Sequence, residues 1–155
     1  MTTLNISKPS GALNQFVWVM RIYVFVYIVG TILFFFMPEE LFYLINIGPK
    51  VFKMFEEIPQ PSEHFWIVLT TSMLVMLCAL SWFSSRSPET KSFVFIHLLS
   101  KGTSVAGFLY VFFKHKPYFA YLIGAVCDAS IFLTILGFYL RAMAKGNALK
   151  PAAAA

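Results

Sequence analysis

The chain has 155 residues, of which 59% are hydrophobic, 18% are aromatic and only 12% are charged. Soluble domains carry roughly 25% charged residues, so this chain has too few to cover a water-facing surface. Disorder is also excluded, because disordered chains have low hydrophobicity and high charge. The net charge of +5 is spread between apolar runs and forms no basic face, which speaks against nucleic-acid binding. The composition therefore indicates a chain that is solvated by lipid.

Four long apolar segments follow one another along the chain. A helix needs about 20 apolar residues to span a bilayer, and each segment reaches that length. Helices are the only structure that leaves no backbone group unpaired in such runs. We therefore expect an all-α integral membrane protein, with a four-helix transmembrane domain over residues 13–146. The predicted helices cover about 13–37, 62–85, 92–113 and 118–143.

The connections between these segments differ in length. Residues 85–91 and 114–117 form short loops, which predict antiparallel neighbours and hence an antiparallel bundle. The first connection, 38–61, carries four prolines, and these exclude one continuous helix. Its apolar residues instead predict two short amphipathic helices in the outer interface, one around 41–45 and one between Pro49 and Pro59. Three roles remain open for this segment: a surface connector, a lid over the bundle mouth, or a docking face for a partner.

Lysine and arginine are distributed unequally between the two ends of the predicted bundle. Cytoplasmic loops carry an excess of these residues, so the richer end predicts that both termini are cytoplasmic, in an inner or plasma membrane. Residues 1–12 would form a cytoplasmic N-terminal segment, and residues 147–155 a short disordered tail. The richer end holds Lys8, Arg86, Lys91, Arg141, Lys145 and Lys150, and the poorer end Lys50, Lys53, Lys114 and Lys116.

Two charged residues, Lys101 and Asp128, lie near the middle of the third and fourth predicted helices. A hairpin that turns at about residue 115 places them at equal depth on neighbouring helices. An unpaired charge at the bilayer centre costs roughly 2.5–3.5 kcal/mol or more. Small residues surround both positions and favour close helix approach. We therefore expect an ionised Lys101–Asp128 pair inside the bundle.

Further polar residues extend from this pair. His97 lies one helical turn before Lys101, and Ser104 continues the same stripe. Arg21 on the first helix is at a depth similar to that of His97, so Arg21, His97, Lys101 and Asp128 predict a polar track from the cytoplasmic side. The alternatives stay open: Arg21 as an interface anchor, His97 as a histidine bonded within the bundle, and the pair as a lock for helix register. In the functional alternative, the pair lines a polar cavity that binds a ligand or relays a proton.

No catalytic constellation is found in the sequence: there is no zinc spacing, no Gly-rich phosphate loop and no nucleophile elbow. We therefore expect a non-enzymatic accessory or scaffold subunit of a larger membrane complex, whose partners are the lipid bilayer and other membrane subunits. The alternative is a membrane-embedded binder or carrier of a small amphiphile, a lipid or a quinone, at Lys101, Asp128 and His97. No cofactor and no metal is assigned.

The layout of four helices with short second and third connections is similar to that of small DoxX-like membrane proteins. These are four-helix bundles linked to quinone or redox partners. The likeness is one of layout, and no site residue is carried over from it.

Overall fold

The structure, a computed structural model, describes residues 11–53, 55–59 and 64–148. These residues form helices and no strands, which confirms the predicted all-helical class. Residues 1–10 of the predicted N-terminal segment and residues 149–155 of the predicted tail lie outside the described residues. The helices are α1 (Gly11–Phe36), α2 (Pro38–Phe52), α3 (Phe65–Arg86), α4 (Lys91–Lys114) and α5 (Phe119–Ala148).

The four predicted spans are present as α1, α3, α4 and α5. Each is long and apolar enough to cross a membrane, and none contains a proline that would break its hydrogen bonds. Helix α5 is longer than predicted, because it continues to Ala148 and includes the first two residues of the expected tail.

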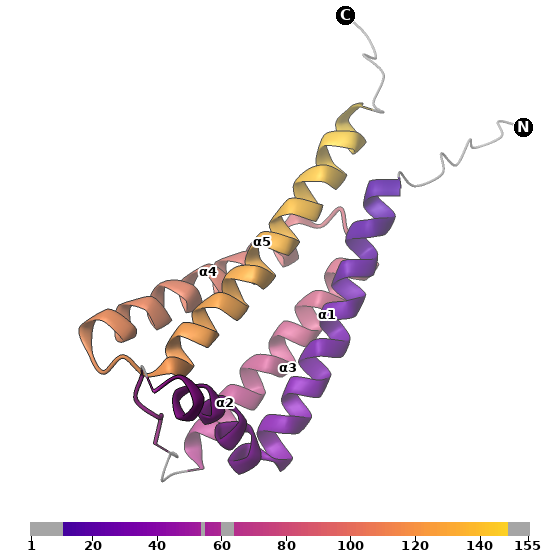
Figure 1. Cartoon of the computed structure of the whole chain (residues 1–155). Helices are drawn as coiled ribbons and strands as arrows, with labels where there is room; N and C mark the ends of the chain where they lie inside the picture. Colours follow the sequence, from indigo (N-terminus) through magenta and orange to yellow (C-terminus); the bar gives the residue numbers. More distant parts are fainter. Residues whose placement is uncertain (1–10, 54, 60–63, 149–155) are drawn as a thin grey trace, which may run out of the picture.

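The four long helices pack chiefly in a ring. Helix α1 contacts α3 and α5, and α4 contacts the same two helices from the other side. The shorter α2 packs against α5 and α1. In Figure 1, α1 begins and α5 ends at one end of the molecule, while α2 lies at the opposite end.

The apolar core is small and lies towards the end where α1 begins and α5 ends. Many large apolar side chains elsewhere are exposed, among them Phe25 and Phe113, which are 67% and 76% exposed. This distribution is what lipid allows, because apolar surface gains little by leaving an apolar solvent. The core cluster contains Phe16, Met20, Val94, Ile135 and Ala142.

The connector between α1 and α3 differs from its prediction. Two short helices were expected, with a break at Pro49, but α2 runs without interruption through Pro49 to Phe52. Pro49 stands in the last turn of α2, so its missing N–H removes one helical hydrogen bond and leaves the rest of the helix intact. The helix ends at Phe52, and the residue that caps it, Lys53, has a φ of 53° and donates its N–H to the Pro49 carbonyl at 2.8 Å. Residues 55–59 form no second helix.

The connector is fastened to the turn between α4 and α5 by a group of rings that we call the aromatic latch: Phe52, Phe55, Phe112 and Phe119. The Phe55 ring lies 5.5 Å from that of Phe119 and 6.1 Å from that of Phe112, between centroids. Phe119 also lies directly on the backbone of Gly48 in α2, where any Cβ atom would collide with the ring. A glycine is therefore required at position 48 for this close approach.

The side chain of Asn46 in α2 binds the backbone of the segment that follows the helix. Its side-chain amide donates to the Ile58 carbonyl at 2.9 Å and its oxygen accepts the Ile58 N–H at 3.0 Å. These two bonds hold residues 55–59 against α2. Two exposed ion pairs lie on the same segment, Lys50–Glu57 at 3.7 Å and Lys116–Glu56 at 3.5 Å.

Candidate functional site

The candidate site is centred on a charged pair that joins α4 to α5. Lys101 Nζ donates to Asp128 Oδ1 at 2.6 Å, and the two side chains are only 8% and 14% exposed. A bond between two ionised groups is shorter and stronger than a neutral hydrogen bond. The structure thus brings together the two charges that the hairpin argument places at equal depth.

Close packing of α4 on α5 makes this contact possible. Gly124 on α5 faces the ring of Phe108 on α4, and a Cβ atom at Gly124 would lie 2.8 Å from that ring. The absence of a side chain at Gly124 lets the two helices approach one turn away from Asp128. Small residues at helix crossings act in this way in membranes.

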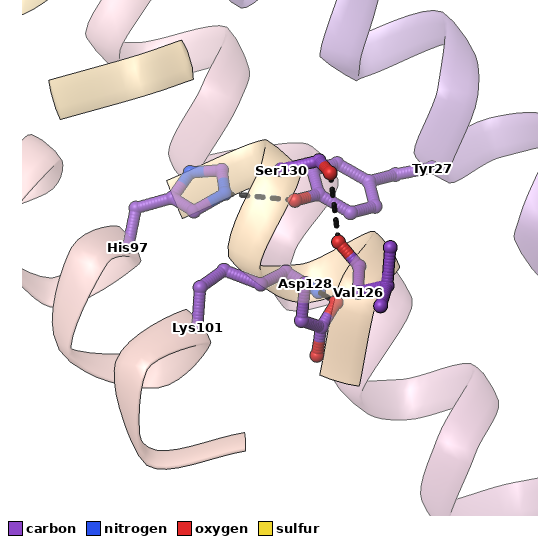
Figure 2. Close-up of polar contacts among 6 residues, drawn as sticks. All are labelled: Tyr27, His97, Lys101, Val126, Asp128 and Ser130. Carbon is purple, nitrogen blue, oxygen red and sulfur yellow. Dashed lines mark hydrogen bonds and ion pairs between the residues drawn. The ribbon is translucent and has the colours of Figure 1, made fainter. Parts of the chain in front are cut away.

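A second polar contact joins Tyr27 of α1 to His97 of α4. Tyr27 Oη lies 2.8 Å from His97 Nε2, and both residues are buried. Lys101 Nζ lies 5.4 Å from the centroid of the Tyr27 ring, within the range of a cation–π contact. We call Tyr27, His97, Lys101 and Asp128 the polar cluster. Figure 2 shows the two contacts converging from three helices.

A nearby hydroxyl does not belong to the polar cluster. Ser130 Oγ donates to the carbonyl of Val126 in its own helix, at 2.7 Å (Figure 2). Its hydrogen-bonding capacity is met locally, as is common for serine inside a helix. Ser130 is therefore not a candidate ligand.

Two of the predicted site residues, Arg21 and Ser104, lie apart from the polar cluster. Arg21 is exposed, and its guanidinium carbon lies 5.8 Å from the Trp18 ring centroid. Tyr27 lies six positions after Arg21, so with 3.6 residues per turn the two side chains point in different directions. Ser104 is half-buried two turns along α4 from His97, and no hydrogen bond joins it to the cluster within the described residues. Of the five candidate residues, the structure joins Lys101 with Asp128, and places His97 beside them through Tyr27.

Tyr27 is the residue that sequence reasoning missed. It lies in the middle of an apolar run, where a tyrosine hydroxyl needs a hydrogen-bond partner once it is buried. Its spacing of four residues from Tyr23 puts both rings on one face of α1, with centroids 6.2 Å apart. A tyrosine at mid-span is therefore the signal that could have indicated an inward-facing polar group on α1.

The side chains of the polar cluster bond to one another, except that one buried nitrogen has no partner within the described residues. Lys101 bonds to Asp128, and the Tyr27 hydroxyl bonds to one ring nitrogen of His97. The other ring nitrogen, Nδ1, is buried and has no hydrogen-bond partner within the described residues. Over the same residues, no three His, Cys, Asp or Glu side chains gather as a metal site would require. The cluster can orient a polar group or a water molecule, and its free atom for doing so is His97 Nδ1.

Comparison with protein-family models, curated proteins and solved structures finds no match to this chain. The similarity to DoxX-like proteins therefore remains one of layout. The function has to be argued from the polar cluster and from the outer faces of the helices.

Proposed function

We propose that this chain is an integral membrane protein whose four long helices cross the bilayer as antiparallel neighbours, and that it serves as a non-enzymatic accessory or scaffold subunit of a larger membrane complex. The observation that carries the proposal is the contrast between the inside and the outside of the bundle. Inside, the charged and aromatic polar groups of the cluster bind one another. Outside, the helices present large apolar and aromatic side chains.

The outward aromatic side chains are the features available for contact with other subunits. They occur on three of the long helices: Trp18 and Phe25 on α1, Trp66 on α3, and Phe95 on α4 are each more than half exposed. Rings of this size bury much surface and dominate the energetics of interfaces. Lipid would solvate the remainder of the apolar exterior.

Basic residues stacked on aromatic rings support the proposed placement in the bilayer. Arg86 lies 4.9 Å from the Trp82 ring at one end of the bundle, and Lys50 lies 4.8 Å from the Tyr43 ring at the other. Such pairs are typical of the two membrane borders. We place the end with Arg86, Lys91 and Arg141 in the cytoplasm, since the opposite end mixes its lysines with glutamates. Both termini are then cytoplasmic, and α2 lies at the outer border of an inner or plasma membrane.

Site-specific photo-crosslinking tests the subunit role. A photoreactive phenylalanine at Phe25 or Phe95 should give discrete adducts with one companion protein in intact membranes. The same group at Phe16, which is fully buried, is the matched control and should give none. If both exposed positions yield only lipid adducts, and the protein purifies alone and monodisperse in mild detergent, the subunit role is wrong.

One observation favours a second function, the binding of a small amphiphile such as a lipid or a quinone. His97 lies one helical turn from Lys101 of the charged pair, so a polar head group in this part of the bundle would find a donor and an acceptor. Because His97 is fully buried, a head group reaches it only when the helices separate. Native mass spectrometry of protein released from nanodiscs distinguishes the two functions: a retained small molecule that is lost in His97→Phe supports the binder, and a bare chain argues against it.

A further inference from the structure

Several buried polar atoms without partners lie within two helical turns of the loop between α3 and α4. In the described part of the chain, four buried side-chain atoms lack a hydrogen-bond partner: Thr71 Oγ1, Ser81 Oγ, Ser84 Oγ and His97 Nδ1. Thr71 lies in the first half of α3, far along the helix from the others. Ser81, Ser84 and His97 have no exposed surface at all. Buried polar groups nearly always have a protein or water partner. We therefore expect these three atoms to have a hydrogen-bond partner, such as water.

The alignment of α3 and α4 places these atoms at successive depths. The rings of Phe83 and Phe93 stack with centroids 5.4 Å apart, which fixes the level of one helix against the other. With a rise of about 1.5 Å per residue, Ser81 lies about 3 Å deeper than this stack, His97 about 6 Å and Lys101 about 12 Å. Ser84 lies slightly above the stack, towards the turn. Polar atoms therefore occur at successive depths between the α3–α4 turn and the charged pair.

The two serines differ from the other hydroxyls of the long helices. Ser85, Thr31 and Thr134 each donate to a carbonyl of their own helix at 2.7 Å. Ser81 and Ser84 do not, although bonding to the preceding turn is the usual arrangement for a helical serine. They also lie three residues apart and hence on one face of α3. Their hydrogen-bonding capacity is left for a partner outside the helix.

His97 has the same need whichever of its nitrogens carries the proton. If Nε2 accepts from the Tyr27 hydroxyl, Nδ1 carries hydrogen and needs an acceptor. If Nε2 donates to Tyr27, Nδ1 needs a donor. Water serves as either, and a buried water bound by two to four polar groups is a regular component of protein interiors.

We propose that Ser84, Ser81 and His97 line a narrow water-binding track that opens at the α3–α4 turn and ends at the Lys101–Asp128 pair. The track makes the charged pair accessible to water from one side of the membrane only. This role goes beyond that of a passive subunit, because it gives the chain a hydrated half-path into an otherwise apolar bundle. The neighbouring apolar cluster around Phe16 and Ile135 stays dry.

Cysteine accessibility to silver ions tests the opening of the track, since Ag⁺ is small enough to follow water. The protein, in lipid nanodiscs, carries Cys78→Ala and Cys127→Ala, and then Ser84→Cys or Ser81→Cys. The matched control is Ala142→Cys, which is equally buried and lies in the apolar cluster towards the same end of the bundle. Silver ions that reach a cysteine in the folded protein prevent its later labelling by maleimide after denaturation. This protection should develop at least about tenfold faster at positions 84 and 81 than at position 142. Equal rates at all three positions would overturn the proposal.

Water contact at the inner end is measured separately by water-edited NMR of the ring nitrogens in histidine-labelled protein without cysteine changes. His64 and His115 are exposed and act as internal positive controls, and His97→Gln identifies the His97 signal. We expect the His97 ring to receive magnetisation from water, and Ser81→Val to reduce this transfer severalfold. A dry His97 overturns the proposal. Water at His97 with no silver access at positions 84 and 81 also overturns it, because that water would be sealed inside the protein.

Discussion

The polar cluster and the aromatic latch hold the same molecule together in different ways. The cluster joins α1, α4 and α5 through a few short polar contacts among buried side chains. The latch joins α2 to the α4–α5 turn through rings that pack on one another and on Gly48. The ion pairs beside the latch involve side chains that are 46% to 67% exposed, whereas those of the buried pair are 8% and 14% exposed.

The difference follows from the solvent around each region. Apolar contact between helices in lipid contributes little free energy to their association. Polar contacts and close packing therefore specify which helix faces meet. Beside the latch the charged side chains are exposed, so their ion pairs contribute little and ring packing determines the fit. Four predictions test this comparison.

Breaking the buried pair should have the largest effect. Asp128→Asn or Lys101→Met leaves one charge buried alone, which costs about 3–5 kcal/mol in a protein interior and less in lipid, where the free residue can rearrange. The double variant should recover much of the loss, because the pair contributes little beyond offsetting its own desolvation. A double-mutant cycle on thermal unfolding in detergent measures the coupling. Simple addition of the two single losses would show that the residues are not coupled.

The latch should be broken most directly through Gly48. Gly48→Ala forces a Cβ atom into the Phe119 ring, and overpacking of this kind costs about 1–3 kcal/mol. Helix propensity alone would predict a gain of up to about 1 kcal/mol. Gly107→Ala is the control, since a Cβ atom there meets nothing within 4 Å. Melting temperature and trypsin cleavage at Lys50 and Lys53 should both report a loosened connector for Gly48→Ala only; a stabilised Gly48→Ala would refute the contact.

The second contact of the polar cluster should have a smaller effect than the charged pair. Tyr27→Phe removes the hydroxyl and leaves His97 Nε2 buried without a partner, at a cost of about 1–2 kcal/mol. Tyr23→Phe is the matched control, because that hydroxyl makes no hydrogen bond within the described residues. Melting temperatures of the two variants in the same detergent decide the matter: equal values would mean that the Tyr27–His97 bond adds nothing to stability.

The exposed ion pairs at the latch should matter least. Glu56→Gln removes the charge that faces Lys116 at 3.5 Å, and exposed pairs of this kind are worth about 0.2–1 kcal/mol. The small loss should shrink further at high ionic strength, because salt screens exposed charges. Melting curves of wild type and variant at low and high salt would show this. A loss as large as that of Asp128→Asn would contradict the contrast between the two regions.

The amino-acid sequence was sufficient to predict the four apolar helices and the meeting of Lys101 with Asp128. Span length follows from bilayer thickness and backbone hydrogen bonding, which act locally. The equal depth of the two charges follows from counting residues on either side of a short turn. Neither argument requires knowledge of how the helices are rotated.

The tertiary structure alone decided the features that depend on rotation and packing. The rotation of α1 brings Tyr27 inward and turns Arg21 outward, and no periodicity indicated it because α1 is apolar on all sides. Packing of Phe119 on Gly48 holds the connector in place, and α2 continues through Pro49 because the lost hydrogen bond falls in its last turn. The alignment of Ser81, Ser84 and His97 also depends on the Phe83–Phe93 stack between two helices. Local sequence sets where helices form and how deep each residue lies, whereas the face that each helix turns inward is set by side-chain packing between segments far apart in the chain.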